Sequence, residues 1–308
     1  MSSTKPFLDL TRFLSMADSP KQRLECSRPL DERLFRYLDT SANSTSLPQI
    51  QCFYEVLRES VENAERASLI GATTSMRAAG HPVQVWSYSP QKLEFLSQLG
   101  IELRAADEII PRTLFERVLE GAEIRYFSDL FRYAVLYQHG GLWMDTDVVL
   151  LRPFAFRGDY FFNLQWRGGE NGHFVCTNVI YAAKNSRHLK TLYLFSIDCF
   201  FSGRRDFGDI GPKLLSDYIA SDNGTELCDW VFSPVVFNSI DWTETSLLYK
   251  PITQLADYLD DERVHGVHLW NARTHGVPSA SDSFLSVLLS CSQPGMRIAD
   301  QFKIMNER

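Results

Sequence analysis

The chain has 308 residues, of which 44% are hydrophobic and 13% aromatic. This composition can bury a large core and excludes an intrinsically disordered chain. Lys and Arg number 31 against 38 Asp and Glu, which gives a formal net charge of -7. That balance argues against a nucleic-acid-binding protein, because basic side chains supply most of the affinity for nucleic acid. It also disfavours binding to an anionic membrane by charge alone.

The cysteines and the apolar runs predict a soluble chain that is made in a reducing compartment. None of the six cysteines forms a Cys-x-x-Cys pair, so a zinc ribbon or a thioredoxin-like site has no support. The first 16 residues carry charges within their apolar stretch, unlike a signal peptide. No run approaches the roughly 20 apolar residues of a transmembrane helix. We therefore expect a cytoplasmic protein.

The first 48 residues differ in composition from the rest of the chain. They are rich in Ser and Thr, and only residues 28–39 have a helical pattern. Residues 40–49 read as a turn-rich linker. We expect residues 1–48 to form a flexible arm or a small helical cap, and residues 49–308 to form the main domain.

An alternation of strands and helices begins at residue 50. Strands are expected at residues 50–54, 83–88 and 101–105, and helices at residues 56–79, 90–99 and 112–120. Strands that alternate with helices over short connections are typical of a parallel α/β sheet.

The segment 126–154 carries the strongest pattern of the chain. A helix is expected over residues 128–139, with Ser128 as its N-cap and Gly140 as the left-handed residue that ends it. A buried strand then leads into Asp145 and Asp147, and a second strand follows from residue 148.

Asp145 and Asp147 form an Asp-x-Asp triplet at the end of that buried strand. In open α/β sheets, ligands bind outside the carboxyl ends of the strands. Two carboxylates there suit Mg²⁺ or Mn²⁺ carrying a diphosphate. The alternative interpretation is an acidic turn that faces water.

On the preceding helix, Asp129, Arg132, Tyr133 and Leu136 share one face, because their spacing is i, i+3, i+4 and i+7. Asp129 and Arg132 are either a surface ion pair or a carboxylate and a guanidinium presented to a polyhydroxylated, anionic ligand.

Together these residues resemble the DXD-containing sugar-binding region of glycosyltransferase family thirty-two. That family includes bacterial capsule and lipopolysaccharide sugar transferases and is akin to the clostridial glucosylating toxins. The resemblance rests on Ser128-Asp129, Arg132-Tyr133, Gly140-Gly141 and Asp145/Asp147 in this order. It extends over about residues 49–290, including the segments 177–189, 211–215 and 267–271.

The resemblance implies a GT-A type, Rossmann-like mixed sheet flanked by helices. It further implies a divalent metal, Mn²⁺ or Mg²⁺, a UDP-sugar donor and transfer with retention of configuration. Asp147 would bind the metal, and Asp145 would contact donor hydroxyls or share the metal. Asp129 and Arg132 would hold the donor sugar and its diphosphate. These four residues form the expected catalytic set.

Further donor and metal contacts follow from the resemblance. Phe53 or Tyr54 would stack on the uracil, although the Gly-Pro that the family often has after this strand is absent. Asn178 would contact the transferred sugar, and Trp270 would close over the donor. His268 is a candidate third metal ligand. By their residue types alone, His268 and Trp270 are equally well explained as core residues.

The expected activity is that of a hexosyl- or N-acetylhexosaminyltransferase acting on a saccharide, a lipid-linked saccharide or a protein. Such an enzyme would either serve polysaccharide biosynthesis in the cytoplasm, peripheral to the membrane, or act in a host cell as a secreted effector. Two alternatives remain: a non-catalytic protein that binds sugar nucleotides, and a haloacid-dehalogenase-type phosphatase with Asp145 as nucleophile.

Overall fold

The computed structural model describes residues 20–39, 47–59, 61–166, 175–206, 208–255, 259, 261–274 and 283–290. Seven strands form the main sheet: β1 (Ile50–Phe53), β2 (Val83–Ser87), β3 (Glu102–Ala105), β4 (Gly141–Met144), β6 (Tyr160–Leu164), β7 (Val175–Ala182) and β8 (Val231–Phe232). Their order is β3-β2-β1-β4-β7-β6-β8. Two further strands, β5 (Val148–Leu150) and β9 (Gly266–His268), pair antiparallel beside it.

The sheet is parallel at one end and mixed at the other. Strands β1 to β4 run parallel, β7 is antiparallel to both β4 and β6, and β6 pairs parallel with β8. Strand β4 therefore lies where the parallel part meets the antiparallel part. The predicted α/β class and mixed sheet are confirmed.

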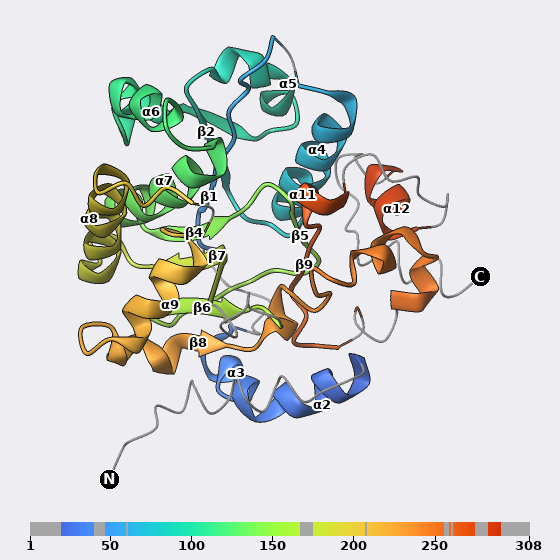
Figure 1. The fold of residues 1–308 in the computed structure, drawn as a ribbon. Helices are drawn as coiled ribbons and strands as arrows, with labels where there is room; N and C mark the ends of the chain where they lie inside the picture. Colours follow the sequence, from blue (N-terminus) through green and yellow to red (C-terminus); the bar gives the residue numbers. More distant parts are fainter. Residues whose placement is uncertain are drawn as a thin grey trace.

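Helices cover both faces of the sheet (Figure 1). The helices packed around the sheet include α4 (Asn63–Ala78), α6 (Arg112–Leu119), α7 (Ile124–His139), α8 (Arg187–Phe201) and α9 (Pro212–Ala220). In the view shown, α7, α8 and α9 lie to one side of the strands and α4 to the other. Two apolar clusters fill the two interfaces, and every residue of β1 is buried. A strand covered on both faces needs such a continuous apolar run.

Short helices complete the described chain. They are α2 (Pro20–Asp31), α3 (Leu34–Tyr37), α5 (Glu94–Ser97), α11 (Asn271–Thr274) and α12 (Phe284–Ser290), with 3₁₀ turns at Pro90–Leu93, Ala106–Glu108, Thr225–Trp230, Pro234–Val236, Thr245–Tyr249 and Ile252–Leu255. Among the described residues, none of the helices has the length and apolar character needed to span a bilayer.

Three expected helix boundaries were wrong. The helix predicted at 56–79 begins at Asn63, because the Glu55 carboxylate accepts hydrogen bonds from the Ser87 hydroxyl and the Tyr88 N–H and so holds the preceding loop over the end of β2. The helix predicted at 28–39 is instead two helices, α2 and α3, and α2 starts at Pro20.

Ser128 is not an N-cap, which corrects the third boundary. Helix α7 begins one turn earlier, at Ile124, after Glu123. Tyr126 and Phe127 in this extra turn are buried in the core, so tertiary packing extends the helix beyond the polar residue that normally favours a start. Gly140 ends the helix with a φ of 70°, so the expected positive φ is confirmed, but its ψ of -166° is extended and not left-handed helical.

The first described helix is tied to the C-terminal half of the chain. Asp31 accepts hydrogen bonds from the N–H and the hydroxyl of Ser233, and its carboxylate forms an ion pair with Arg263 at 3.3 Å. Arg263 also donates to the Ser27 hydroxyl at 2.8 Å. All four side chains are buried. Residues 40–46 of the expected linker and residues 1–19 lie outside the described residues.

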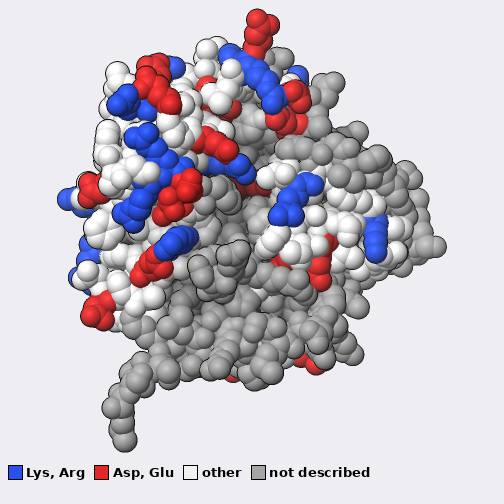
Figure 2. Space-filling model, viewed as in Figure 1, with Lys and Arg blue, Asp and Glu red and all other residues white. Residues whose placement is uncertain are grey.

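The charge distribution agrees with the composition. On the described part of the face in Figure 2, basic and acidic side chains are interspersed over the upper part of the molecule. Among the described residues, Arg104 pairs with Glu108 and Arg117 pairs with Glu120 at the surface. This face therefore presents mixed charge.

Candidate active site

A tight turn places the two aspartates directly after β4. The Asp145 N–H donates to the Asn178 carbonyl at 2.8 Å, and the Val148 N–H donates to the Asp145 carbonyl at 3.0 Å. The Asp147 carbonyl accepts from the Leu269 N–H at 2.8 Å. Backbone hydrogen bonds to β7 and to the segment after β9 thus fix the turn on two sides.

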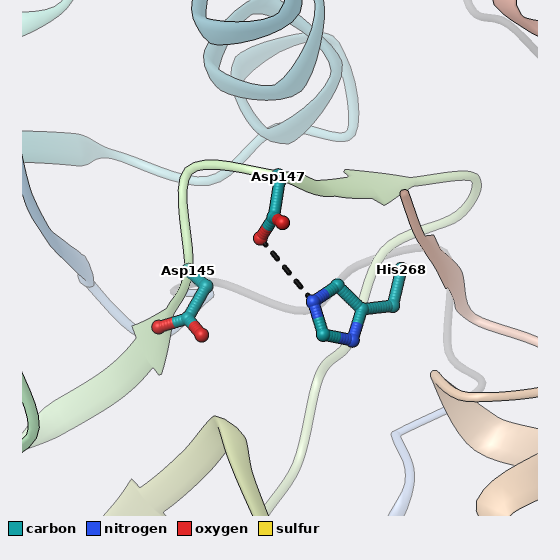
Figure 3. Close-up of side chains that lie close together, drawn as sticks. All are labelled: Asp145, Asp147 and His268. Carbon is teal, nitrogen blue, oxygen red and sulfur yellow. Dashed lines mark ion pairs between the residues drawn. The ribbon is translucent and has the colours of Figure 1, made fainter. Parts of the chain in front are cut away.

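Asp145, Asp147 and His268 form one cluster, shown in Figure 3. Each offers one ligand atom, and these atoms lie within 4.8 Å of one another. His268 reaches the cluster because β9 pairs with β5 so that His268 faces Val148, the residue after Asp147. The His268 Nε2 lies 3.3 Å from Asp147 Oδ1.

The pKa values of the two aspartates depart from the ordinary value in opposite directions. Burial raises the pKa of Asp145 to about 6, although Arg132 acts against this rise. Burial also acts to raise the pKa of Asp147, but His268 and the backbone N–H of Asn271 outweigh it and lower that pKa below its ordinary value. Asp147 is therefore the more acidic of the two carboxyl groups.

This set of donors fits a divalent cation. Two carboxyl groups and one imidazole converge in a partly buried place, and a cation there would stabilise the carboxylate forms. Carboxylate oxygen suits both Mg²⁺ and Mn²⁺, whereas an imidazole ligand favours the transition metal.

Asp129 and Arg132 form a buried ion pair, not a surface one. Their exposed fractions are 5% and 4%, and Arg132 Nη2 lies 3.1 Å from Asp129 Oδ1. The same nitrogen lies 3.3 Å from Asp145 Oδ1. The guanidinium also donates to the carbonyls of Ser128 and Thr177. Arg132 therefore connects helix α7 to the DXD motif.

Asp129 is further enclosed by Thr177 and Gly211. The Thr177 hydroxyl donates to Asp129 Oδ1 at 3.2 Å. A Cβ atom on Gly211 would lie 2.4 Å from Asp129 Oδ2, so only glycine fits at the start of α9. Burial raises the pKa of Asp129, while Arg132 lowers it.

Trp270 covers His268. Their ring centroids lie 3.8 Å apart with the ring planes tilted by 33°, and the Trp270 indole donates to the Ile240 carbonyl at 3.0 Å. Trp270 has a φ of 54°, which is rare for a bulky residue. The next residue, Asn271, directs its N–H to Asp147 Oδ2 at 3.0 Å. The strained backbone of Trp270 thus directly precedes the residue whose N–H contacts Asp147, a candidate metal ligand.

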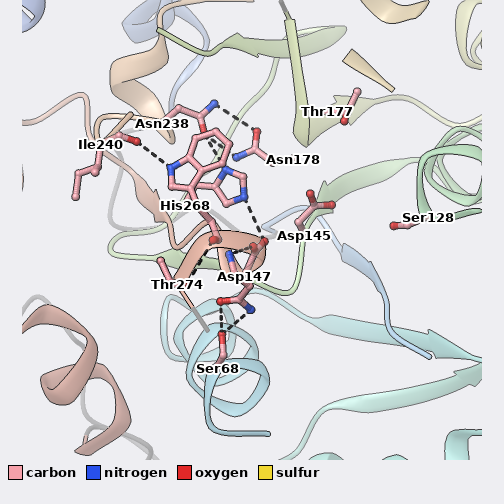
Figure 4. A network of polar contacts seen from close by, with 12 residues as sticks. Ser68, Ser128, Asp145, Asp147, Thr177, Asn178, Asn238, Ile240, His268 and Thr274 are labelled. Atoms are coloured by element: carbon pink, nitrogen blue, oxygen red, sulfur yellow. Dashed lines mark hydrogen bonds and ion pairs between the residues drawn. The ribbon is translucent and has the colours of Figure 1, made fainter. Parts of the chain in front are cut away.

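Asn178 lies in a buried network of amides behind the cluster (Figure 4). Its side chain donates to Asn238 Oδ1 at 2.8 Å and accepts from Asn163 at 3.3 Å. Asn238 Oδ1 in turn lies 3.3 Å from His268 Nδ1. Sequence reasoning missed Asn238, which stands in no motif, and gave no role to Asn271, the last residue of the segment 267–271. The register of β5 and β9 brings His268 to Val148, and Asn271 then contacts Asp147 while Asn238 contacts His268.

The two aromatic candidates after β1 have different surroundings. Phe53 is 6% exposed and packs against the rings of Tyr88, Phe127 and Phe131. Tyr54 is half-buried, and its hydroxyl lies 3.4 Å from Glu65. Phe53 is therefore a core residue, whereas Tyr54 keeps an accessible part.

Comparison with known proteins points to sugar transfer. Residues 88–168 match the family model of the glycosyltransferase sugar-binding region containing DXD motif. No curated protein matches the chain. Among solved structures, the PaToxG glycosyltransferase is similar with a TM-score of 0.44 and 10% identity, covering 68% of this chain and 79% of that one.

A second similar structure is the apo-form glycosyltransferase GlyE of Streptococcus pneumoniae TIGR4. Its TM-score is 0.49 at 13% identity, covering 85% of this chain and 64% of that one. The present chain thus spans less than two thirds of GlyE. Similarity at this level carries no inference about function, so the assignment rests on the family model. The segment with Asp129, Arg132, Asp145 and Asp147 matches the DXD sugar-binding region of glycosyltransferases.

Proposed function

We propose that the protein transfers a sugar from a UDP-sugar to an acceptor hydroxyl, with retention of configuration and in dependence on Mn²⁺ or Mg²⁺. The observation that carries this proposal is the convergence of Asp145, Asp147 and His268 at the end of β4. Asp145 and Asp147 lie in the matched sugar-binding region, residues 88–168, whereas His268 lies outside it. The carboxyl end of such a strand is the usual ligand position in α/β sheets.

Asp145, Asp147 and His268 would hold the metal. When bound, the metal supplies positive charge for the diphosphate and so stabilises the UDP leaving group. The acceptor hydroxyl has to be held close to the anomeric carbon, which lowers the entropic part of the barrier. No nucleophilic side chain is assigned in this proposal.

Asp129 and Arg132 would act together on the donor side. The Arg132 guanidinium is already committed to Asp129, Asp145 and two carbonyls. It therefore acts first by holding the two carboxylates in place, and its positive charge favours an anionic diphosphate nearby. Asp129 and Asp145 would accept sugar or ribose hydroxyls.

The exposure and the neighbours of each side chain decide which of the remaining candidates would contact the donor. Tyr54, which is half-buried, is the better candidate than Phe53 for stacking on the uracil. Trp270 would close over the donor, since its ring already lies against that of His268. Asn178 would act on the transferred sugar through the amide network, because its own side chain is 1% exposed.

The proposal names classes of acceptor and two possible locations of the enzyme. A saccharide, a lipid-linked saccharide or a protein would receive a hexosyl or N-acetylhexosaminyl unit. We place the enzyme in the cytoplasm, peripheral to the membrane, in polysaccharide biosynthesis; a secreted effector acting in a host cell is the alternative. Residues 1–48 would form the arm and residues 49–308 the transferase domain.

The substitution Asp147→Asn tests the metal assignment. It removes one anionic ligand while keeping the size of the side chain, so we expect turnover with Mn²⁺ to fall at least about a hundredfold. Asp159→Asn removes an exposed charge outside the cluster and should leave turnover unchanged. Circular dichroism checks that both variants fold. Wild-type turnover in Asp147→Asn would contradict the assignment.

A further inference from the structure

We propose that Asn238 is a positioning residue for the metal site: its side-chain oxygen holds the Nδ1 proton of His268, so that Nε2 is the nitrogen presented to a cation. This inference rests on the proposed function only in taking His268 as a ligand.

The orientation of the Asn238 amide follows from two neighbours. Its Nδ2 donates to the Leu164 carbonyl at 2.9 Å, and a carbonyl only accepts. Its Oδ1 accepts from Asn178 Nδ2 at 2.8 Å. A flipped amide would place Nδ2 against the Asn178 donor and Oδ1 against the Leu164 carbonyl. The oxygen of Asn238 is therefore the atom on the side of His268.

This oxygen lies 3.3 Å from His268 Nδ1. Because an amide oxygen cannot donate, Nδ1 has to carry the hydrogen of this contact. A bare Nδ1 would place its lone pair against the lone pairs of the oxygen, in a place where His268 is 7% and Asn238 is 1% exposed. Nδ1 is thus the protonated nitrogen.

The other ring nitrogen then faces the carboxylates. His268 Nε2 lies 3.3 Å from Asp147 Oδ1 and belongs to the cluster with Asp145. The Trp270 ring lies against the His268 ring, and the backbone N–H of His268 donates to the carbonyl of Phe237, the residue before Asn238, at 3.1 Å. Histidine ligands to metals are commonly oriented by such a hydrogen bond on the second nitrogen.

The contact also links distant parts of the chain. Asn163 on β6, Asn178 on β7, Asn238 after the 3₁₀ turn Pro234–Val236 and His268 on β9 form one continuous chain of hydrogen bonds, and the last three of them are labelled in Figure 4. Asn238 contacts His268 directly, whereas Asn178 and Asn238 both lie between Asn163 and His268. The two residues therefore provide a matched pair for substitution.

Two measurements test the inference. The first records ¹⁵N NMR signals of the His268 ring in the metal-free and the Mg²⁺-loaded protein. The second measures the dissociation constant for Mn²⁺ alone by electron paramagnetic resonance. The variants are Asn238→Leu, which lacks an acceptor, Asn238→Asp, which keeps an acceptor oxygen, and Asn163→Leu, which removes a buried amide remote from His268.

We expect a protonated Nδ1 in the wild type with and without Mg²⁺. Asn238→Leu should weaken Mn²⁺ binding about 10- to 100-fold, the range for loss of such an outer hydrogen bond. Asn238→Asp should keep the Nδ1 proton, and Asn163→Leu should keep both the proton and the Mn²⁺ affinity.

Two results would overturn the inference: a bare Nδ1 in the wild type, or an unchanged Mn²⁺ affinity in folded Asn238→Leu. If Asn238→Leu does not fold, the wild-type NMR signals and Asn238→Asp still decide. A wild type with a protonated Nδ1 that binds no Mn²⁺ would contradict the proposed metal dependence and not the position of the proton.

Discussion

Tyr54 and Phe53 are adjacent aromatic residues with opposite surroundings, and they show how a residue's role depends on its neighbours. Phe53 contacts three aromatic rings in the core, while Tyr54 turns out of it and lies near Glu65. Truncation of Phe53 would mainly cost stability, about 3 to 5 kcal/mol for a buried aromatic residue. Tyr54 is the residue at which donor binding can be tested without unfolding the protein.

Tyr54→Ala should raise the KM for the UDP-sugar about tenfold and leave kcat nearly unchanged, because stacking on a base contributes about 1 to 3 kcal/mol. Initial rates at several donor concentrations measure both constants. Tyr193→Ala, a half-buried tyrosine on α8, serves as control and should not change KM. An unchanged KM in Tyr54→Ala would remove Tyr54 from the donor site.

The sequence identified the residues of the motif but not the side chains that hold them in position. Asp145, Asp147 and His268 were predicted, because carboxylates after a strand and a histidine in a matching late segment have recognisable chemistry. No role was predicted for Asn238 or Asn271, since an amide by itself carries no pattern. Their importance arises from the pairing of β5 with β9, which no local spacing reveals.

At the scale of elements, Gly141 joins helix α7 to strand β4 and so sets the position of the DXD motif. It has a φ of 97°, and a Cβ atom there would lie 2.5 Å from the Gln49 carbonyl oxygen. That same oxygen accepts the hydrogen bond from the Leu142 N–H at 2.9 Å. An added methyl group would therefore disturb the start of the strand.

Gly141→Ala should lower the free energy of unfolding by at least about 2 kcal/mol more than Gly203→Ala. Both positions have a positive φ, which costs roughly 1 to 2 kcal/mol for alanine, but nothing lies within 4 Å of the Cβ position at Gly203. The excess in Gly141→Ala comes from the clash and the weakened hydrogen bond. Urea denaturation measures both values, and equal losses would show that the close approach is unimportant.

The strands were predicted more accurately than the helix starts. Apolar runs bounded by turns identified β1 and β4, which are almost entirely buried. Alternating apolar and polar residues identified β2, whereas β3, at the edge of the sheet, is only half-buried. The helix starts depended on tertiary contacts: the Glu55 carboxylate delays α4, and the buried Tyr126 and Phe127 extend α7. Such contacts override local capping preferences.

At the scale of the whole molecule, buried polar groups tie the C-terminal half to the rest of the fold. His265 lies beside Arg263 in this half, and the Val236 carbonyl accepts from its backbone N–H. Its Nδ1 donates to the Arg263 carbonyl at 3.0 Å, and its ring packs against Phe154. Burial lowers the pKa of His265 from 6.5 to about 4. The folded protein thus keeps this imidazole neutral over a range in which the unfolded chain protonates it.

This difference predicts a loss of stability in mild acid. Because the pKa of His265 is lower in the folded state, the folded state is favoured fully by this neutral imidazole above pH 6.5. The free energy of unfolding should therefore decrease by roughly 3 kcal/mol as the pH falls from 6.5 toward 4. His265→Asn keeps a donor but does not titrate, so it should be less stable at neutral pH and depend less on pH in this window. Unfolding curves at several pH values measure the effect, and identical pH dependence in both proteins would contradict it.

The central claim is that the cluster at the end of β4 supports metal-dependent transfer from a UDP-sugar. The most direct measurement is the release of UDP from a panel of UDP-sugars without acceptor, with Mn²⁺ and again with EDTA, accompanied by a Mn²⁺-dependent UDP-binding assay. We predict slow hydrolysis of one donor that EDTA abolishes. Hydrolysis that EDTA leaves unchanged, or neither hydrolysis nor Mn²⁺-dependent binding of UDP, would contradict the account.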